Sequence, residues 1–302
     1  MAKGIFLLGN GFDLDLGLAT SYSDFAKSKQ WNDLMDESIH SAEDDYLLGF
    51  LRKRYQVEKW IDIEAALLEF AIQKTKSHNT IHANEDRIDF YHLRNSLRAY
   101  LLEEQSKFVL KKNSLASALL MCFGEMSSAT RIYTFNYTLP EVLAGKFNYP
   151  IPNRIEHIHG SLRDGDDIIL GVETRTGIDD GYAFLYKTQN RHYRHTDIMR
   201  DLRDKDEYIF FGHSLNGMDY EYFRMTFTLL AGSSNRTPRL TIITKDVNSE
   251  EAFKVFLRKE GISLQGLYSY ANPTFILTDE IYNKNKEESG KVAELLNRIN
   301  EM

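Results

Sequence analysis

The stretch Ile5-Phe6-Leu7-Leu8-Gly9-Asn10-Gly11-Phe12-Asp13 decides the fold expected for this chain. Its run of apolar residues predicts a strand that is buried on both faces, as in a parallel sheet covered by helices. The glycines that follow allow a tight turn and let a phosphate approach main-chain N–H groups near a helix start. We therefore expect Gly9 to Asp13 to form the phosphate-binding turn of a nucleotide-binding α/β domain.

The spacing of these glycines departs from the usual dinucleotide fingerprint, Gly-x-Gly-x-x-Gly. Position 14 is Leu14, and the third glycine comes only at Gly17. A tight turn without a ligand is the alternative interpretation, because the short motif is weak by itself. Residues further along the chain must distinguish a phosphate-binding turn from a turn without a ligand.

Short apolar strands recur between longer helical patterns, which favours a parallel sheet flanked by helices. After Ile5 to Leu8, strands are expected over Arg131 to Phe135, Arg154 to Ile158, Ile168 to Leu170, Tyr208 to Phe211 and Leu240 to Thr244. The chain is expected to form a single α/β domain over residues 1–302.

The interval between the first two strands is too long for one crossover connection and shows helical spacing. Stripes at three- and four-residue steps comprise Leu47, Phe50, Leu51 and Arg54, then Trp60, Ile63, Leu67 and Phe70, then Phe90, Leu93, Leu97 and Leu101. They predict an all-helical insertion over roughly residues 35–112. A further helix is expected between Lys284 and Asn300.

Composition excludes several classes of protein. The 302 residues are 42% hydrophobic and 27% charged with a formal charge of −7, which suits a globular protein and not a binder of duplex nucleic acid. Cys122 is the one cysteine, so neither an internal disulfide nor a cysteine-based zinc site can form. Without an apolar run near the ~18 residues of a membrane span, or a signal-peptide pattern, a cytoplasmic protein is expected.

Two polar residues at expected strand ends are candidates for catalysis. Asn136 follows the second strand, where its amide can bind a ribose hydroxyl or hold a water; capping the next segment is the alternative. His159 ends the third strand and can act as a general base near neutral pH, with Gly160 allowing close approach of a substrate. A histidine without any ligand is the alternative there.

The remaining candidates are weaker. Gly212 and Ser214 follow a buried strand and can approach a phosphate or ribose, whereas Asp219 also suits a helix N-cap. Glu64, in Trp60-Ile61-Asp62-Ile63-Glu64, is either a substrate-orienting lid residue or an acid favoured by the helix dipole. His157 and His159 share one strand face, but no further ligand stands at a recognisable spacing, so no metal is expected. His192 and His195 are typical of a solvated basic segment.

Taken together, these motifs resemble the AbiH family of bacteriophage abortive infection proteins. The resemblance covers most of the chain and rests on Gly9 to Asp13, Gly17 to Phe25, Trp60 to Glu64, Thr134 to Tyr137, His159 to Ser161 and Gly212 to Leu215. It implies a bacterial antiviral effector. A phage-derived trigger and assembly into a homo-oligomer are compatible with that role.

The order of motifs is also similar to sirtuin-like, Rossmann-like NAD-binding domains. The resemblance implies that Asn136 positions the attacking water or the ribose, that His159 is the general base, and that Gly9, Gly11 and Ser214 hold phosphates. The residues expected to bind the nucleotide are Gly9, Asn10, Gly11, Phe12, Asp13, Thr20, Gly212, Ser214 and Asp219. Deacetylation is not expected, since the four-cysteine zinc module is missing, and Thr138 stands where many relatives have Asp.

The function implied is binding of NAD, or a related nucleotide, and hydrolysis of its nicotinamide glycosidic bond when infection triggers the protein. A nucleotide sensor or scaffold without turnover, whose helical insertion docks a partner, is the alternative. A nuclease is a third possibility, which the negative net charge and the missing metal cluster disfavour.

Overall fold

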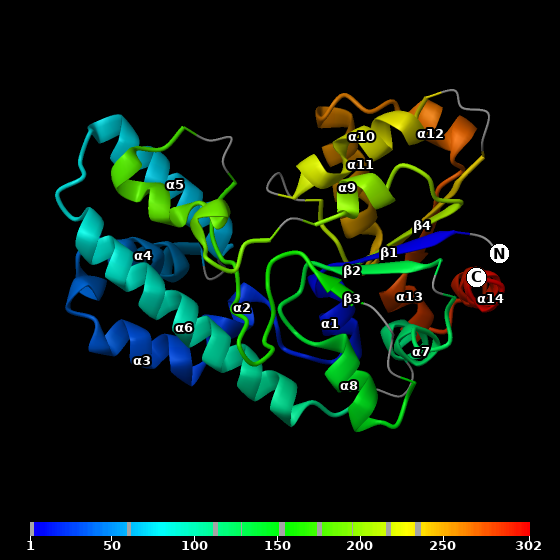
Figure 1. The fold of residues 1–302 in the computed structure, drawn as a ribbon, viewed down its shortest axis with the longest axis horizontal. Coiled ribbons are helices and arrows are strands. Elements are labelled where there is room, and N and C mark those ends of the chain that lie inside the picture. Colours follow the sequence, from blue (N-terminus) through cyan, green and yellow to red (C-terminus); the bar gives the residue numbers. More distant parts are fainter. Residues whose placement is uncertain are drawn as a thin grey trace. The chain divides into compact units, whose positions relative to one another are not determined.

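The computed structural model describes residues 3–58, 62–110, 114–127, 129–150, 155–173, 177–194, 196–215, 219–232 and 237–302. The chain divides into two compact units. The first unit comprises Met1–Leu18, Phe108–Ile158 and His195–Met302, and the second comprises Ala19–Lys107 and His159–Arg194. Each unit is thus assembled from segments that are distant in the sequence (Figure 1).

The first unit contains a six-stranded sheet whose strands are all parallel. The strands are β1 (Gly4–Leu8), β2 (Arg131–Thr134), β3 (Ile155–His157), β4 (Glu207–Phe211), β5 (Arg239–Thr244) and β6 (Thr274–Leu277). Their order is β3-β2-β1-β4-β5-β6, so the direction of winding reverses between β1 and β4. Because Leu8 pairs with Thr134 on one side and Phe211 on the other, these three strands end at one level.

Helices cover both faces of this sheet (Figure 1). Because successive residues of a strand point to opposite faces, each face has its own apolar core. Ile5 and Leu7 belong to one apolar core, and Phe6 and Leu8 to another. The first core includes residues of α9 (Ile198–Asp201), α10 (Tyr220–Leu230), α11 (Val247–Lys259) and α12 (Leu264–Tyr270). The second includes residues of α1 (Asn10–Leu16), α7 (Leu115–Cys122), α8 (Pro140–Lys146) and α14 (Lys286–Asn300), with Ile281 of α13 (Thr278–Tyr282) packed against it.

The second unit is mainly helical. Its helices are α2 (Tyr22–Phe25), α3 (Lys29–Glu37), α4 (Leu47–Glu58), α5 (Ile63–Ser77) and α6 (Ala83–Lys107), with short 3-10 helices η1 (Ile39–Ala42), η2 (Asp180–Leu185) and η3 (Lys187–Gln189). The buried Tyr182 of η2 packs edge-on against Phe70 of α5, with ring centroids 5.8 Å apart. Its hydroxyl donates a hydrogen bond of 2.8 Å to Asp86 of α6. Residues 159–194 are therefore an integral part of this unit.

Most elements predicted from apolar periodicity are confirmed, with small shifts at their ends. The stripes within 47–101 coincide with α4, α5 and α6, and the C-terminal helix begins at Lys286. Trp60, Ile61 and Arg154 lie outside the described residues.

The strand predicted over Ile168 to Leu170 is wrong. Ile168 makes only an isolated antiparallel bridge with Gly160 in the second unit. These three residues are buried but do not join the sheet. Their apolar run therefore reflects a buried segment and not a strand. Conversely, one strand was missed: β6 was not predicted, although it completes the sheet beside β5.

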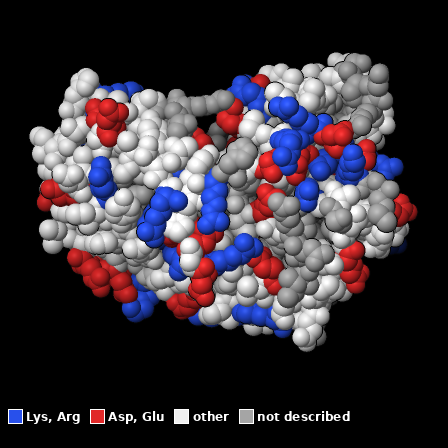
Figure 2. All heavy atoms as spheres, in the orientation of Figure 1, with Lys and Arg blue, Asp and Glu red and all other residues white. Residues whose placement is uncertain are grey.

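The surface charge is mixed. On the face drawn in Figure 2, Lys and Arg side chains lie among Asp and Glu side chains. Among the described helices, none combines the length and apolar character needed to cross a bilayer.

Candidate functional site

The glycines at the end of β1 lie directly against the glycine at the end of β4. The N–H of Gly9 donates to the carbonyl of Phe211 at 2.9 Å, and the N–H of Gly11 donates to the carbonyl of Gly212 at 3.0 Å. A Cβ on Gly11 would lie 2.5 Å from the Cα of Gly212, which itself has a φ of +62°. Only glycines allow this backbone contact, so the first role of Gly9, Gly11 and Gly212 is to join two strand ends.

The neighbouring residues of the turn have separate roles. Phe12 is fully buried and packs edge-on against Phe211, with ring centroids 5.3 Å apart. Asn10 begins α1 and is exposed, and Thr20 belongs to the second unit. Phe12 therefore serves the core, whereas Asn10 is exposed at the end of the sheet.

A buried polar cluster joins this turn to the end of β2. The Asn136 amide nitrogen donates to Oδ1 of Asp13 at 2.8 Å and to the Gly9 carbonyl at 3.0 Å. The Thr138 hydroxyl donates to Oδ2 of Asp13 at 2.6 Å. Thr138 thus adds a second side-chain donor to the carboxyl group of Asp13.

The surroundings of Asp13 change its acidity. Burial raises the pKa of this carboxyl to about 7, against the lowering effect of the hydrogen bonds from Thr138 and Asn136. Its side chain is only 1% exposed. Asp13 therefore changes its charge near neutral pH inside the unit, where a charge is costly to bury.

Asn136 is positioned by the strand that it follows. Its backbone N–H donates to Oγ1 of Thr134, the last residue of β2, at 3.1 Å. Among the hydrogen bonds of the described residues, none reaches its amide oxygen. Asn136 does not cap the next helix, because the N-cap of α8 is Leu139, so the capping alternative is wrong.

Beyond β4, a histidine that the sequence did not single out lies at the same end of the sheet. The Leu215 N–H donates to Nδ1 of the buried His213 at 3.1 Å, so a neutral ring carries its proton on Nε2. That nitrogen lies 3.8 Å from Oδ2 of Asp219. Ser214 is exposed. The position of His213 directly after Gly212 was the available signal.

Asp219 stands at the N-cap position of α10, but its side chain makes no capping hydrogen bond. The prediction that Asp219 opens the next helix as its N-cap residue is therefore confirmed, although the side chain does not contribute a capping hydrogen bond. Asn216, Gly217 and Met218, which precede it, lie outside the described residues.

In the second unit, the turn that follows β3 is shaped by a returning segment. The His159 carbonyl accepts a hydrogen bond of 2.8 Å from the Ile169 N–H. Gly160 has a φ of +71°, and a Cβ there would lie 2.0 Å from the carbonyl oxygen of Asp167. The Ser161 hydroxyl donates to Asp166 at 2.7 Å. The His-Gly-Ser motif is thus a folded turn with a buried histidine.

His159 and Glu64 both contact a lysine that was not predicted. Nζ of Lys187 lies 3.4 Å from Nε2 of His159 and 3.1 Å from Oε1 of Glu64. Lys187 is 0% exposed, and His159 is also buried. Glu64 lies in the first turn of α5, where Asp62 caps the helix through the Ala65 N–H. Nothing in the spacing of Lys187 along the sequence marks it.

Two further histidines, His157 and His192, lie beside carboxylates. His157 is 3.6 Å from Glu141, and His192 is 3.4 Å from Asp166. His195 lies outside the described residues. Within the part of the chain that is described, no group of three or more His, Cys, Asp or Glu is arranged to hold a metal ion.

Sequence-predicted residues therefore gather in two clusters. Gly9, Asp13, Asn136 and Gly212 meet in the first unit, and Glu64 and His159 are linked through Lys187 in the second. The first cluster lies at the carboxyl ends of parallel strands, where the strand order reverses, and this is where open α/β sheets bind ligands. Fold and site together define an α/β protein whose candidate site lies at the carboxyl edge of a parallel sheet.

Comparison with known families identifies the group to which the chain belongs. A family model described as "Bacteriophage abortive infection AbiH" matches residues 5–238. The protein is thus a member of the AbiH family, and its role lies in abortive infection by bacteriophage. A comparison with curated proteins found no match.

Proposed function

We propose that the carboxyl edge of the sheet binds NAD or a related nucleotide, and that the protein hydrolyses the nicotinamide glycosidic bond when a phage infects the cell. The observation that supports this most is the buried Asp13-Asn136-Thr138 cluster beside the Gly11–Gly212 contact. The strand order equals that of Rossmann-type dinucleotide-binding sheets. The order of site motifs supports a sirtuin-type version of that fold.

The structure alters which groups would hold the nucleotide. The N–H groups of Gly9 and Gly11 already donate to the carbonyls of Phe211 and Gly212, so they are not the phosphate donors. In the proposal, the exposed Asn10 and Ser214 side chains contact phosphate or ribose instead. The glycines contribute indirectly, because their small size lets the two turns meet beneath the ligand.

Hydrolysis requires few groups. Water attacks the anomeric carbon of the ribose, the carbon–oxygen bond forms as the carbon–nitrogen bond breaks, and nicotinamide leaves with the bonding electron pair. Asn136 orients the water or the ribose through its amide oxygen. His159, which belongs to the second unit, is the candidate for the general base of the reaction.

A second candidate is a nucleotide sensor that performs no reaction. The observation that favours it is that the Asn136 amide nitrogen is engaged with Gly9 and Asp13, as expected of a residue that stabilises the turn. In this case nucleotide binding persists without product.

The two candidates differ in cells expressing the protein during phage infection. Mass spectrometry of nucleotide pools is expected to show early loss of NAD and release of nicotinamide with the native chain. The His159→Ala variant should lose on the order of 100-fold in this rate while still binding NAD in calorimetry. The matched control is His92→Ala, which alters an exposed histidine of α6.

Full NAD loss with His159→Ala would refute the assignment of the base. Binding of NAD by the native chain without any NAD loss would identify the sensor. Absence of nucleotide binding altogether would overturn the proposal.

A further inference from the structure

We propose that Lys187 caps the basic nitrogen of His159 and so keeps the resting protein inactive. This inference rests on His159 being the base in the proposed function. It assigns a regulatory task to a lysine that the proposed chemistry does not otherwise use, and it changes the role of Glu64 from substrate orientation to support of the cap.

The contact between the two side chains has a definite chemical direction. The ammonium group of Lys187 has three donors and no acceptor, so Nε2 of His159, 3.4 Å away, must be the acceptor. The neutral imidazole then carries its proton on Nδ1. A general base needs an available lone pair, and the lone pair of Nε2 faces the ammonium group. In this state His159 cannot take a proton from water at Nε2.

The cap is held in place by the backbone and by an ion pair. The Lys187 N–H donates to the Val172 carbonyl at 2.9 Å. Gly171 has a φ of +146°, and a Cβ there would lie 2.2 Å from the Leu185 carbonyl oxygen. Glu64 lies 3.1 Å from the ammonium group and balances its charge. Lys187 is completely buried, so protein atoms enclose the ammonium group in this state.

Removing the ammonium group should therefore activate the protein. Lys187→Met leaves the Glu64 carboxylate without this cation, which is costly for a poorly exposed charge. The double variant Lys187→Met with Glu64→Gln removes both charges and is the better test. Lys187→Arg retains a cationic donor and should retain the capped state.

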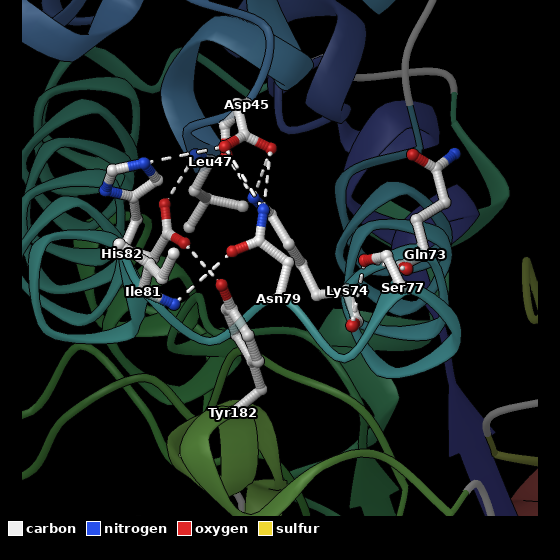
Figure 3. A network of polar contacts seen from close by, with 10 residues as sticks. Asp45, Leu47, Gln73, Lys74, Ser77, Asn79, Ile81, His82 and Tyr182 are labelled. Atoms are coloured by element: carbon white, nitrogen blue, oxygen red, sulfur yellow. Dashed lines mark hydrogen bonds and ion pairs between the residues drawn. The ribbon is translucent and has the colours of Figure 1, made fainter.

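The chain offers a matched control in another buried lysine. Lys74 of α5, also in the second unit, is 4% exposed and lies 2.6 Å from Oδ1 of Asp45. Figure 3 shows Lys74 directed at Asp45, which Asn79 and His82 also approach. Lys74→Met with Asp45→Asn removes a buried lysine together with its carboxylate partner, which is exposed, and it should leave basal NAD levels unchanged.

The first measurement is the tautomer of His159, read by NMR of the nucleotide-free protein with nitrogen-15-labelled histidine. The native chain and Lys187→Arg are expected to show the proton on Nδ1. The double variant should shift the ring toward the tautomer with the proton on Nε2, since the donor at Nε2 is gone. If the His159 ring of the native chain carries its proton on Nε2, the inference is wrong, regardless of the tautomers found in the variants.

The second measurement is NAD loss in uninfected cells. The double variant is expected to deplete NAD at least about tenfold faster than the native chain, because an unmasked base contributes factors of this size or more. The inference is wrong if the double variant depletes NAD in uninfected cells no faster than the native chain. This conclusion applies when the double variant also has a normal melting curve and depletes NAD during infection as the native chain does. If the tautomers behave as expected but no variant depletes NAD even during infection, the proposed hydrolysis fails while the contact between Lys187 and His159 stands.

Discussion

At the scale of single residues, the surroundings of Asp13 determine its behaviour. The carboxyl group is buried at the end of β1, and the donors Asn136 and Thr138 only partly offset the cost of its charge. A carboxyl group with a pKa near 7 responds to pH in a range where an exposed aspartate stays charged. This has a measurable effect on the stability of the fold.

Because the pKa of Asp13 is about 7 in the folded state and near 3.8 in the unfolded chain, the folded state binds the proton more tightly. The stabilisation from this proton is complete below pH 3.8 and is lost as the pH rises to about 7. The loss amounts to on the order of 4 kcal/mol for three pKa units. In urea titrations between pH 4 and pH 8, Asp13→Asn should remove this dependence.

The exposed Asp36 provides the control for that experiment. Asp36→Asn should leave the pH dependence of the unfolding free energy as it is in the native chain. An Asp13→Asn variant whose stability falls over the same pH range as that of the native chain would rule out Asp13 as its source.

Sequence patterns located some site residues and missed others for a physical reason. Asp13 and Asn136 were found because parallel strands end at a common edge, so residues just beyond two strands must lie close together. Lys187 was missed because its partner Glu64 is 123 positions away, and only folding of the second unit joins them. Phe12 was assigned to the nucleotide site, but its neighbours are core aromatics.

At the scale of elements, burial decided which strands the sequence revealed. β1, β4 and β5 are buried along most of their length and consist largely of apolar residues, so their positions were predicted within a residue or so. β6 has a short run of Phe275, Ile276 and Leu277 directly after Pro273 and Thr274, which is a weak strand signal. Ile168 to Leu170 shows that the same kind of run can be buried outside a sheet.

The contact between the β1 turn and the end of β4 gives a prediction at this scale. In Gly212→Ala, the new methyl group would lie 2.3 Å from the Cα of Gly11, a rigid backbone atom. The expected cost combines roughly 1–2 kcal/mol for the left-handed φ with about 1–3 kcal/mol for overpacking. The free energy of unfolding, measured with urea, should fall by that sum.

Gly165→Ala separates the two contributions. Gly165 also has a positive φ, of +78°, but nothing lies within 4 Å of the position its Cβ would take. This variant should lose only the conformational part. Equal losses for Gly165→Ala and Gly212→Ala would mean that the contact between the turns contributes nothing.

At the scale of the whole molecule, ligand binding and stability are linked. A nucleotide that binds only the folded protein adds about 2.7 kcal/mol to its stability at 100 times the dissociation constant. We expect NAD to raise the melting temperature of both the native chain and His159→Ala, because this histidine is assigned to chemistry and not to affinity. Thermal denaturation with increasing NAD tests this expectation.

Nicotinamide riboside serves as the control ligand because it lacks the phosphates. It should shift the melting temperature less than NAD at equal concentration. A melting temperature that no nucleotide changes would contradict a nucleotide site on this protein.

The position of β1 in the middle of the sheet has a consequence for synthesis of the protein. Leu8 pairs with Phe211, which leaves the ribosome about 200 residues later. At ordinary rates of elongation this interval lasts roughly 10–40 s. During that time the edge of β1 that pairs with β4 has no partner strand. A chain cut short before β4 can form neither the complete sheet nor the contact between Gly11 and Gly212.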